Sequence, residues 1–461
     1  MSSLLIYDLE TSGLMILDQV LQFAAIRLDR HTLEEIERYN VEVAWRRDMV
    51  PSVDAYLVHQ LGVDRPGIVA ESVAVVEMHQ ALNQPGTMSG GYNTLGFDDE
   101  MLRFAFYRTL LPPYTHQYQN QCGRFDLLPM VVFYYLYAPD TLIWPKKDNG
   151  LPSFKLEDFN RENQWVEGRS HDAMNDVEAT VAMLRHLRLN KPMWDYLLGY
   201  FDKQTDQKRV NDLMAQEGRY AGVGMMIHLR FGQGRHYQAP VLHLGPHHVY
   251  KNQLVFLRLD EPLGDLSDDT IMPLMVKKKL GEPGFVLPYV DRYTKNLPHD
   301  TKMIVDANLE MLANADISEF VQHCRHQMYD SIEGVDLDAM LYQQSFLSKD
   351  ETDWCTSFHL AQNKGALLEQ HSNPVLQEQA LRYLWRFFPE QIPGALQSAA
   401  EVSIKSFVHQ GLDFKGQVKQ TPQQALSRID AVAVEADKGL QEGMMQLKNH
   451  AQTILEEIEA P

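Results

Sequence analysis

The sequence predicts an α/β domain, followed by a small β domain and an α-helical C-terminal domain. Strand-like and helical patterns alternate up to about residue 190. Short apolar runs with Gly and Pro turns then fill residues 220–300, which is typical of antiparallel strands. From about residue 340 the pattern is helical, and it ends in an amphipathic segment from Gln423 to Glu459. For a chain of 461 residues we therefore place the domains at residues 1–190, 200–335 and 340–461.

The first domain opens with apolar runs that we expect to be strands: Leu4–Leu9, Leu21–Leu28, Tyr39–Ala44 and Met88–Tyr92. The first run turns acidic at its carboxyl end, just before Gly13. Because side chains alternate along a strand, Asp8 and Glu10 share one face. Two half-buried carboxylates on one face repel each other unless a cation neutralises them. Taken alone, the pattern also fits an acidic strand end in water.

A second acidic motif, "GYNTLGFDDE", leads into a predicted helix. Its apolar side comprises Met101, Leu102, Ala105, Phe106 and Leu110. Asp98 then lies in the first helical turn, where an acidic residue also complements the helix dipole without any catalytic role. We expect Phe97 to anchor this turn in the core. Asn93 serves the preceding loop, through a side-chain turn or through a substrate contact.

The third motif, "SHDAMNDVEAT", precedes and opens another amphipathic helix. Asp176 lies beside the apolar stripe of that helix, and His171 lies on the loop before it. A lone histidine at such a place is often a surface or capping residue. Taken together, however, the three motifs supply four carboxylates and one imidazole. That set is what a two-metal phosphodiesterase requires.

The three motifs resemble those of the DEDDh exonucleases. "DLETSG" is similar to the first motif of that superfamily, "NTLGFD" to the second, and "HDAMND" to the third, of the histidine type. Longer stretches, such as "RFDLLPMVVFYYLYAPDTLIWPKKDNGLPSFKLEDF", resemble the exodeoxyribonuclease I branch. The similarity is strong up to about residue 190 and loose beyond. It implies a mixed-sheet ribonuclease-H-like fold for the first domain and an SH3-like fold for the β domain.

The resemblance also implies a function. It predicts a processive 3′→5′ exonuclease that degrades single-stranded DNA to 5′-mononucleotides in DNA repair and recombination. Asp8, Glu10 and Asp176 would bind the metal next to the nucleophilic water. Asp8 would bridge to a second metal that Asp98 supports, and His171 would be the general base. Two Mg²⁺ ions are expected per site, and Mn²⁺ is expected to substitute.

Two alternatives stay open. One is a DEDDh ribonuclease acting on short RNA or tRNA ends, against which the long C-terminal two-thirds of the chain argues. The other is a catalytically inactive nucleic-acid-binding scaffold for DNA repair, against which the five intact catalytic positions argue.

Strand-binding residues are predicted in two places. Beside the first two motifs the candidates are Thr11, Ser12 and Asn93, and in the β domain they are Arg230, Phe231, Arg235, Tyr237, Lys277 and Lys278. The net charge of −20 argues against tight, non-specific binding of duplex DNA. Only the block 201–300 is not strongly negative, so we expect it to contribute to the strand-binding surface. Ser12 stands where exodeoxyribonuclease I enzymes carry an aromatic residue.

Composition limits the possible partners and compartment. No apolar stretch is long enough to span a membrane, and the N-terminus lacks the basic region of a signal peptide. Three widely spaced cysteines fit a reduced cytoplasmic compartment. We expect a monomer. The resemblance further implies binding of the acidic C-terminal tail of single-strand-binding protein, although Ala138 replaces a basic residue expected in that pocket.

Overall fold

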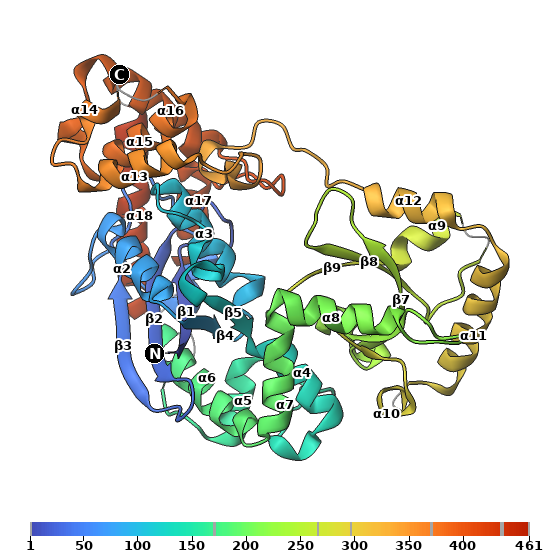
Figure 1. Cartoon of the computed structure of the whole chain (residues 1–461). Coiled ribbons are helices and arrows are strands. Elements are labelled where there is room, and N and C mark those ends of the chain that lie inside the picture. The colour runs from blue at the N-terminus through green and yellow to red at the C-terminus, as the bar shows by residue number, and fades with distance from the viewer. Residues whose placement is uncertain are drawn as a thin grey trace. The chain divides into compact units, whose positions relative to one another are not determined.

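A computed structural model of the chain describes residues 2–168, 172–264, 267–295, 297–368, 372–433 and 438–459 (Figure 1). The chain forms two compact units. The first comprises Met1–Gly123, Val166–Val181 and Ser331–Pro461, and the second comprises Arg124–Trp165 and Ala182–Asp330. These units do not follow the predicted domain boundaries, because the N-terminal strands and the C-terminal helices belong to the same unit.

The first unit is built on a mixed sheet. Its strands are β1 (Ser3–Thr11), β2 (Val20–Asp29), β3 (Glu35–Glu42) and β4 (Thr87–Gly91), in the order β3-β2-β1-β4. β1 pairs antiparallel with β2 and parallel with β4. The predicted ribonuclease-H-like α/β fold is confirmed. Two elements continue from this unit into the second, namely β5 (Gly123–Asp126) and α6 (Ala173–Arg188).

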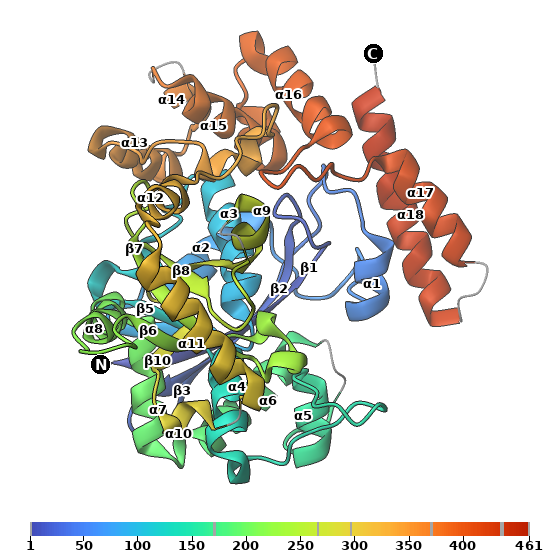
Figure 2. The same ribbon diagram turned by 90° about the vertical axis from the view of Figure 1, so that its right-hand side faces the viewer.

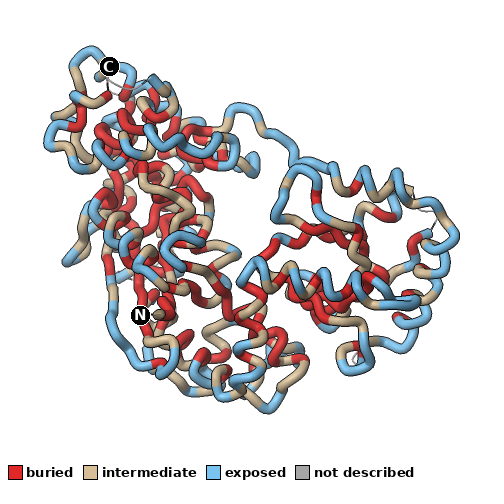
Figure 3. Tube along the Cα trace, viewed as in Figure 1, coloured by how far each residue is buried: buried red, intermediate tan, exposed pale blue. Residues whose placement is uncertain are grey.

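One face of β1 packs into a large core. Leu5, Tyr7 and Leu9 point into this core, and Asp8 and Glu10 therefore lie on the opposite face. The core is completed by side chains of α2 and α3. The helices of this part are α1 (Val53–His59), α2 (Glu71–Asn83) and α3 (Asp98–Arg108). β1 and β2 are buried almost throughout, whereas β3 is largely exposed (Figure 3).

The C-terminal helices complete the same core. They are α13 (Lys349–Leu360), α14 (Gly365–Leu368), α15 (Pro374–Phe387), α16 (Gln397–Gln410), α17 (Pro422–Ala433) and α18 (Lys438–Glu459). Phe407 and Leu447, for example, belong to one apolar cluster with Leu5 and Phe23. The predicted amphipathic segment from Gln423 to Glu459 thus forms two helices, α17 and α18, which lie side by side (Figure 2).

Buried ion pairs also join the C-terminal helices to the N-terminal part. Arg386 of α15 donates to Asp48 at 2.7 Å and to Asp338 at 2.7 Å, and all three side chains are almost fully buried. Arg46 donates to Asp48 at 2.7 Å. Although burial alone would raise it, the adjacent Arg386 and Arg46 hold the pKa of Asp48 well below its usual range.

The second unit contains a five-stranded antiparallel sheet, as predicted. Its strands are β6 (Val223–Ile227), β7 (Gln238–Pro246), β8 (Gln253–Arg258), β9 (Met275–Lys279) and β10 (Phe285–Pro288), in the order β10-β6-β7-β8-β9. The helices are α4 (Leu127–Tyr137), α5 (Leu156–Asn163), α7 (Lys191–Leu198), α8 (Lys203–Met214), α9 (Asp268–Ile271), α10 (Asp291–Thr294), α11 (His299–Asn314) and α12 (Ser318–His326). In the described parts of the chain, no helix combines the length and apolarity that a membrane crossing requires.

Candidate metal centre

Three of the predicted carboxylates meet at the carboxyl end of β1. Asp8, Glu10 and Asp176 each place an oxygen within 4.8 Å of the others. Glu10 is buried, and Asp8 and Asp176 are half-buried. Oxygens bound to one Mg²⁺ at about 2.1 Å lie roughly 3–4 Å apart, so small side-chain movements bring all three onto one ion. The structure therefore brings together the residues that were predicted to bind the first metal.

Local geometry explains why these side chains converge. Asp8 and Glu10 follow the alternation of β1, where they lie opposite Ala24 and Gln22 of β2. Gln22 accepts a hydrogen bond from the backbone N–H of Ala173 at 3.3 Å, which fixes the first turn of α6 over this face. Asp176 lies three residues later, in the same first turn, and faces β1. The register of two strands and one backbone contact thus set the position of the third ligand.

Asp98 adds a fourth negative charge to the cluster. It is the first residue of α3 and is 6% exposed. Burial is the largest cause that raises the pKa of Asp8 well above its ordinary value, followed by the charges of Asp98, Asp176 and Glu10. Four partly buried carboxylates this close together repel one another and are unfavourable without a cation. This donor set, made entirely of carboxylate oxygens, suits a hard divalent cation such as Mg²⁺.

The neighbouring acid, Asp99, has a different role. It is fully buried, and its carboxylate contacts His116 Nε2 at 2.9 Å and Arg103 Nε at 3.1 Å. Asp99 is therefore a structural ion-pairing residue, whereas the charge of Asp98 acts on the neighbouring carboxylate of Asp8. Phe97 packs against the core as predicted. Asn93 has a left-handed φ of 66° in the loop before α3, and its contact with substrate stays a prediction.

The predicted general base, His171, lies outside the described residues. The described chain resumes at Asp172, and α6 begins at the next residue. The role of His171 stays a prediction from the third motif.

Thr11 and Ser12 form the turn that follows Glu10. Thr11 Oγ1 donates to the carbonyl of Gly13 at 2.7 Å, and Ser12 Oγ accepts from the backbone N–H of Gln19 at 2.9 Å. Both side chains are buried and hold the turn in place, and their contact with substrate stays a prediction. Leu14, which the sequence analysis did not single out, is 84% exposed in the same turn.

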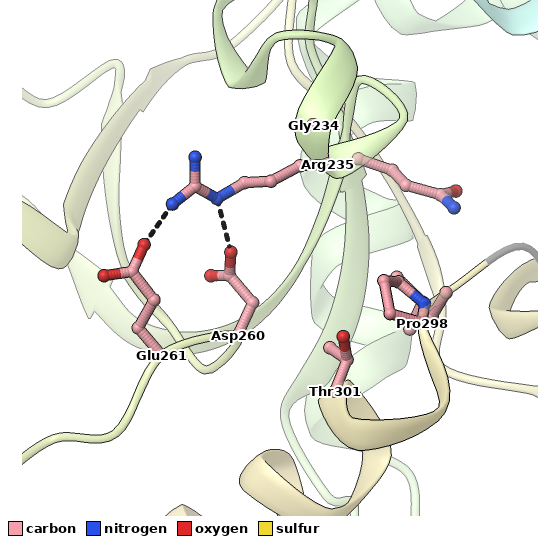
Figure 4. A pocket seen from close by; sticks show the side chains of 8 residues that line it. Gly234, Arg235, Asp260, Glu261, Pro298 and Thr301 are labelled. Atoms are coloured by element: carbon pink, nitrogen blue, oxygen red, sulfur yellow. Dashed lines mark hydrogen bonds and ion pairs between the residues drawn. The ribbon is translucent and has the colours of Figure 1, made fainter.

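In the β domain, the predicted strand-binding residue Arg235 is already paired with acidic side chains. Arg235 donates to Asp260 at 2.7 Å and also to Glu261, at the edge of a cavity of about 320 Å³ (Figure 4). Phe231 and Tyr237 are each 7% exposed. Neither ring is exposed for stacking on bases in this structure, and the contact of these two residues with the strand stays a prediction. Arg230 is exposed, and it remains a predicted strand contact.

Lys277, Lys278 and Lys279, which follow one another in β9, do not form an exposed basic patch. Side chains alternate along β9, so Lys278 points inward, is 2% exposed and pairs with Asp206 at 2.7 Å. Lys277 donates to the carbonyl of Gln327 at 2.9 Å, and Lys279 pairs with Glu282 at 2.7 Å. Lys278 is therefore held by Asp206 in this structure, and its contact with the strand stays a prediction.

Comparison with known proteins agrees with this architecture. Residues 5–184 match the family model described as Exonuclease. Exodeoxyribonuclease I of Escherichia coli K12 is 32% identical over 279 residues, which is 59% of this chain and 57% of that protein. Exodeoxyribonuclease I of Haemophilus influenzae is 32% identical over 221 residues, which is 46% of this chain and 45% of that protein. The sequence matches thus span about half the length of these two relatives.

Solved structures extend the likeness in fold to nearly the whole chain. The crystal structure of E. coli Exonuclease I in complex with a dA16 oligonucleotide has a TM-score of 0.85 at 22% identity and covers 98% of this chain and 100% of that one. Exonuclease I from Methylocaldum szegediense has a TM-score of 0.83 at 23% identity and covers 99% of this chain and 100% of that one. The predicted resemblance to the exodeoxyribonuclease I branch is confirmed.

Proposed function

We propose that this chain is a divalent-metal-dependent 3′→5′ exonuclease that degrades single-stranded DNA to 5′-mononucleotides. The observation that carries the proposal is the convergence of Asp8, Glu10 and Asp176 within 4.8 Å, in the field of Asp98. The similarity to exodeoxyribonuclease I supports the choice of substrate. So do structures of the E. coli enzyme with bound oligonucleotides, whose fold this chain shares.

Each residue of the proposed active site has its own role in the hydrolysis. Asp8, Glu10 and Asp176 would hold the cation beside the attacking water, and Asp98 would support a second cation that shares Asp8. When bound at these residues, two Mg²⁺ ions, with Mn²⁺ as a substitute, would supply activation of the water and stabilisation of the leaving oxygen. His171 takes the proton of the water as general base. Its position in the sequence, two residues before α6 begins, suits a group that reaches the site when substrate is bound.

The proposal also covers the binding partners, the oligomeric state and the location of the protein in the cell. Single-stranded DNA is the proposed substrate, and a processive monomer that acts in DNA repair is the proposed form. Three buried free cysteines, Cys122, Cys324 and Cys355, support a cytoplasmic location. Binding of the tail of single-strand-binding protein is retained as part of the proposal. Half-buried Ala138, the residue that follows α4, supplies no charge to such a pocket.

The experiment uses DNA and RNA oligonucleotides of one sequence, each carrying a fluorophore at its 5′ end. With Mg²⁺, the DNA should shorten stepwise from its 3′ end and release 5′-mononucleotides, whereas the RNA should be degraded far more slowly. A chelator or the substitution Asp8→Ala should abolish the reaction. The matched control is Asp212→Ala, which removes an exposed carboxylate of α8. Equal or faster degradation of RNA would favour the exoribonuclease alternative. Strand binding without any metal-stimulated release would favour the inactive scaffold.

A further inference from the structure

A short hairpin of the C-terminal segment contacts both elements that flank the metal centre. Residues 411–419 form this hairpin, which is closed by a bridge between Leu412 and Val418 and by a hydrogen bond from the N–H of Lys419 to the carbonyl of Gly411 at 2.7 Å. We propose that the 411–419 hairpin positions the metal-binding carboxylates and that Lys419 is its principal positioning residue. This inference rests on the proposed function of the site.

The first contact is made to the turn that follows Glu10. Lys419 Nζ lies 3.4 Å from Asp18 Oδ1, and the second oxygen of Asp18 accepts from the N–H of Met15 at 2.9 Å. Both charged side chains are buried, with exposed fractions of 2% and 9%. The carboxylate of Asp18 also lies so close to Gly13 that a Cβ there would collide with it. Lys419 thus neutralises the group around which this turn is folded.

The second contact is made to the helix that carries Asp98. The ring of Phe414 stacks on Phe104 of α3, with centroids 5.5 Å apart and planes 7° from parallel. Lys415 Nζ contacts Glu100 Oε2 at 2.8 Å, two residues beyond Asp98. The hairpin therefore contacts α3 through Glu100 and Phe104, which lie one turn apart on the same side of the helix.

The turn and α3 are also joined to each other. Arg108, at the end of α3, is 1% exposed and donates to the carbonyl of Ile16 at 3.0 Å and to that of Asp18 at 2.7 Å. Two buried cations, Arg108 and Lys419, consequently hold one turn from different elements. If Lys419 loses its charge, the carboxylate of Asp18 stays buried without that cation. The turn can then relieve this cost by moving toward water, which displaces Glu10.

The test replaces Lys419 by methionine, which keeps the length of the side chain and removes its charge. Binding of Mn²⁺ is measured by titration calorimetry without DNA, and the half-saturating Mg²⁺ concentration is measured in the nuclease assay. We expect both to weaken by about tenfold, the lower end of the losses that partners outside the ligand set cause. The strand affinity, measured in chelator, should be unchanged. Lys405→Met, at an exposed lysine of α16, is the matched control and should change neither value.

A double variant distinguishes a positioning role of Lys419 from general destabilisation of the fold. Asp18→Asn combined with Lys419→Met removes both buried charges while residue 18 still accepts from Met15. The double variant should recover most of the lost metal affinity, as coupled neighbours do in a mutant cycle. If Lys419→Met folds and binds Mn²⁺ as the parent does, the inference is overturned. It is equally overturned if the double variant binds the metal no better than Lys419→Met.

Should Lys419→Met fail to fold, Phe414→Leu with Lys415→Gln loosens the contact of the hairpin with α3 instead. Unchanged Mn²⁺ binding in that variant would overturn the inference. Failure of the proposed function is distinguishable, because the calorimetric readout needs no nuclease activity. A parent protein that binds Mn²⁺ but hydrolyses no strand would refute the function and leave the positioning role standing.

Discussion

Replacing Asp8 by asparagine should make the metal-free protein more stable and remove its response to divalent cations. Asp8 shares its surroundings with Glu10, Asp98 and Asp176, and burial together with their charges raises its pKa well above the ordinary value. In the absence of metal, this crowding opposes folding. An amide of the same shape removes one negative charge without leaving a cavity.

The size of the effect follows from the geometry. Oxygens of Asp8, Glu10 and Asp176 lie within 4.8 Å of one another. At an effective dielectric constant of about 20, each such pair of charges repels by roughly 3 kcal/mol. Because protonation of Asp8 already relieves part of this repulsion, the substitution should raise the free energy of unfolding by about 1–3 kcal/mol, or the Tm by roughly 1–3 °C. In the parent, a cation at about 100 times its Kd should add about 2.7 kcal/mol.

Thermal unfolding in chelator and in Mg²⁺, repeated over a range of pH, measures these effects. A raised folded-state pKa means that the metal-free parent loses stability as the pH rises from the ordinary value for aspartate through the folded value. The asparagine variant should lack this loss. The control Asp212→Asn should behave as the parent does. A lower Tm for Asp8→Asn in chelator, or a full response to Mg²⁺, would refute the reasoning.

Three further substitutions or truncations test other parts of the account. His171→Ala should slow hydrolysis by roughly 10²–10⁴-fold and leave Mn²⁺ binding unchanged, as single-turnover rates and calorimetry would establish; an unchanged rate and pH profile would make His171 structural. Arg386→Met should lower the free energy of unfolding in urea by about 3–5 kcal/mol, because it leaves Asp48 and Asp338 buried without that guanidinium; a loss no larger than that of Arg47→Met, at a half-exposed arginine, would contradict this. A chain ending at Asp330 should fail to fold its N-terminal sheet, because Phe407 and Leu447 belong to the same core as Leu5; native circular dichroism and resistance to protease in that truncated chain would show otherwise.

Local patterns in the sequence predicted the parts of the metal centre that depend on local geometry. Alternation in the first strand placed Asp8 and Glu10 on one face, and the apolar periodicity after "NTLGF" placed Asp98 in the first turn of α3. These features need only neighbouring residues, and the motif resemblance then identified Asp176 as their partner. The contact between Gln22 and Ala173 that sets the approach of Asp176 joins residues 151 positions apart, which no local pattern reveals.

Long-range packing was the part that the sequence left open. We expected the C-terminal helices to form a domain of their own, but buried pairs such as Arg386 with Asp48 and Lys419 with Asp18 join them to the N-terminal part. In the same way, Lys278 adds a positive charge to the sequence, but in the folded unit it forms a buried ion pair with Asp206. Net charge and charge runs report composition, whereas binding surfaces depend on which charges remain exposed after pairing.

The most direct test of the central claim is the position of Mn²⁺ in crystals of the full chain, located by its anomalous scattering. We expect one ion bound by oxygens of Asp8, Glu10 and Asp176, and a second ion on the side of Asp98 that shares Asp8 with the first. The first ion should disappear in crystals of Asp8→Ala. Anomalous density at another cluster, with none between these three carboxylates at saturating Mn²⁺, would contradict the assignment of this site as the metal centre.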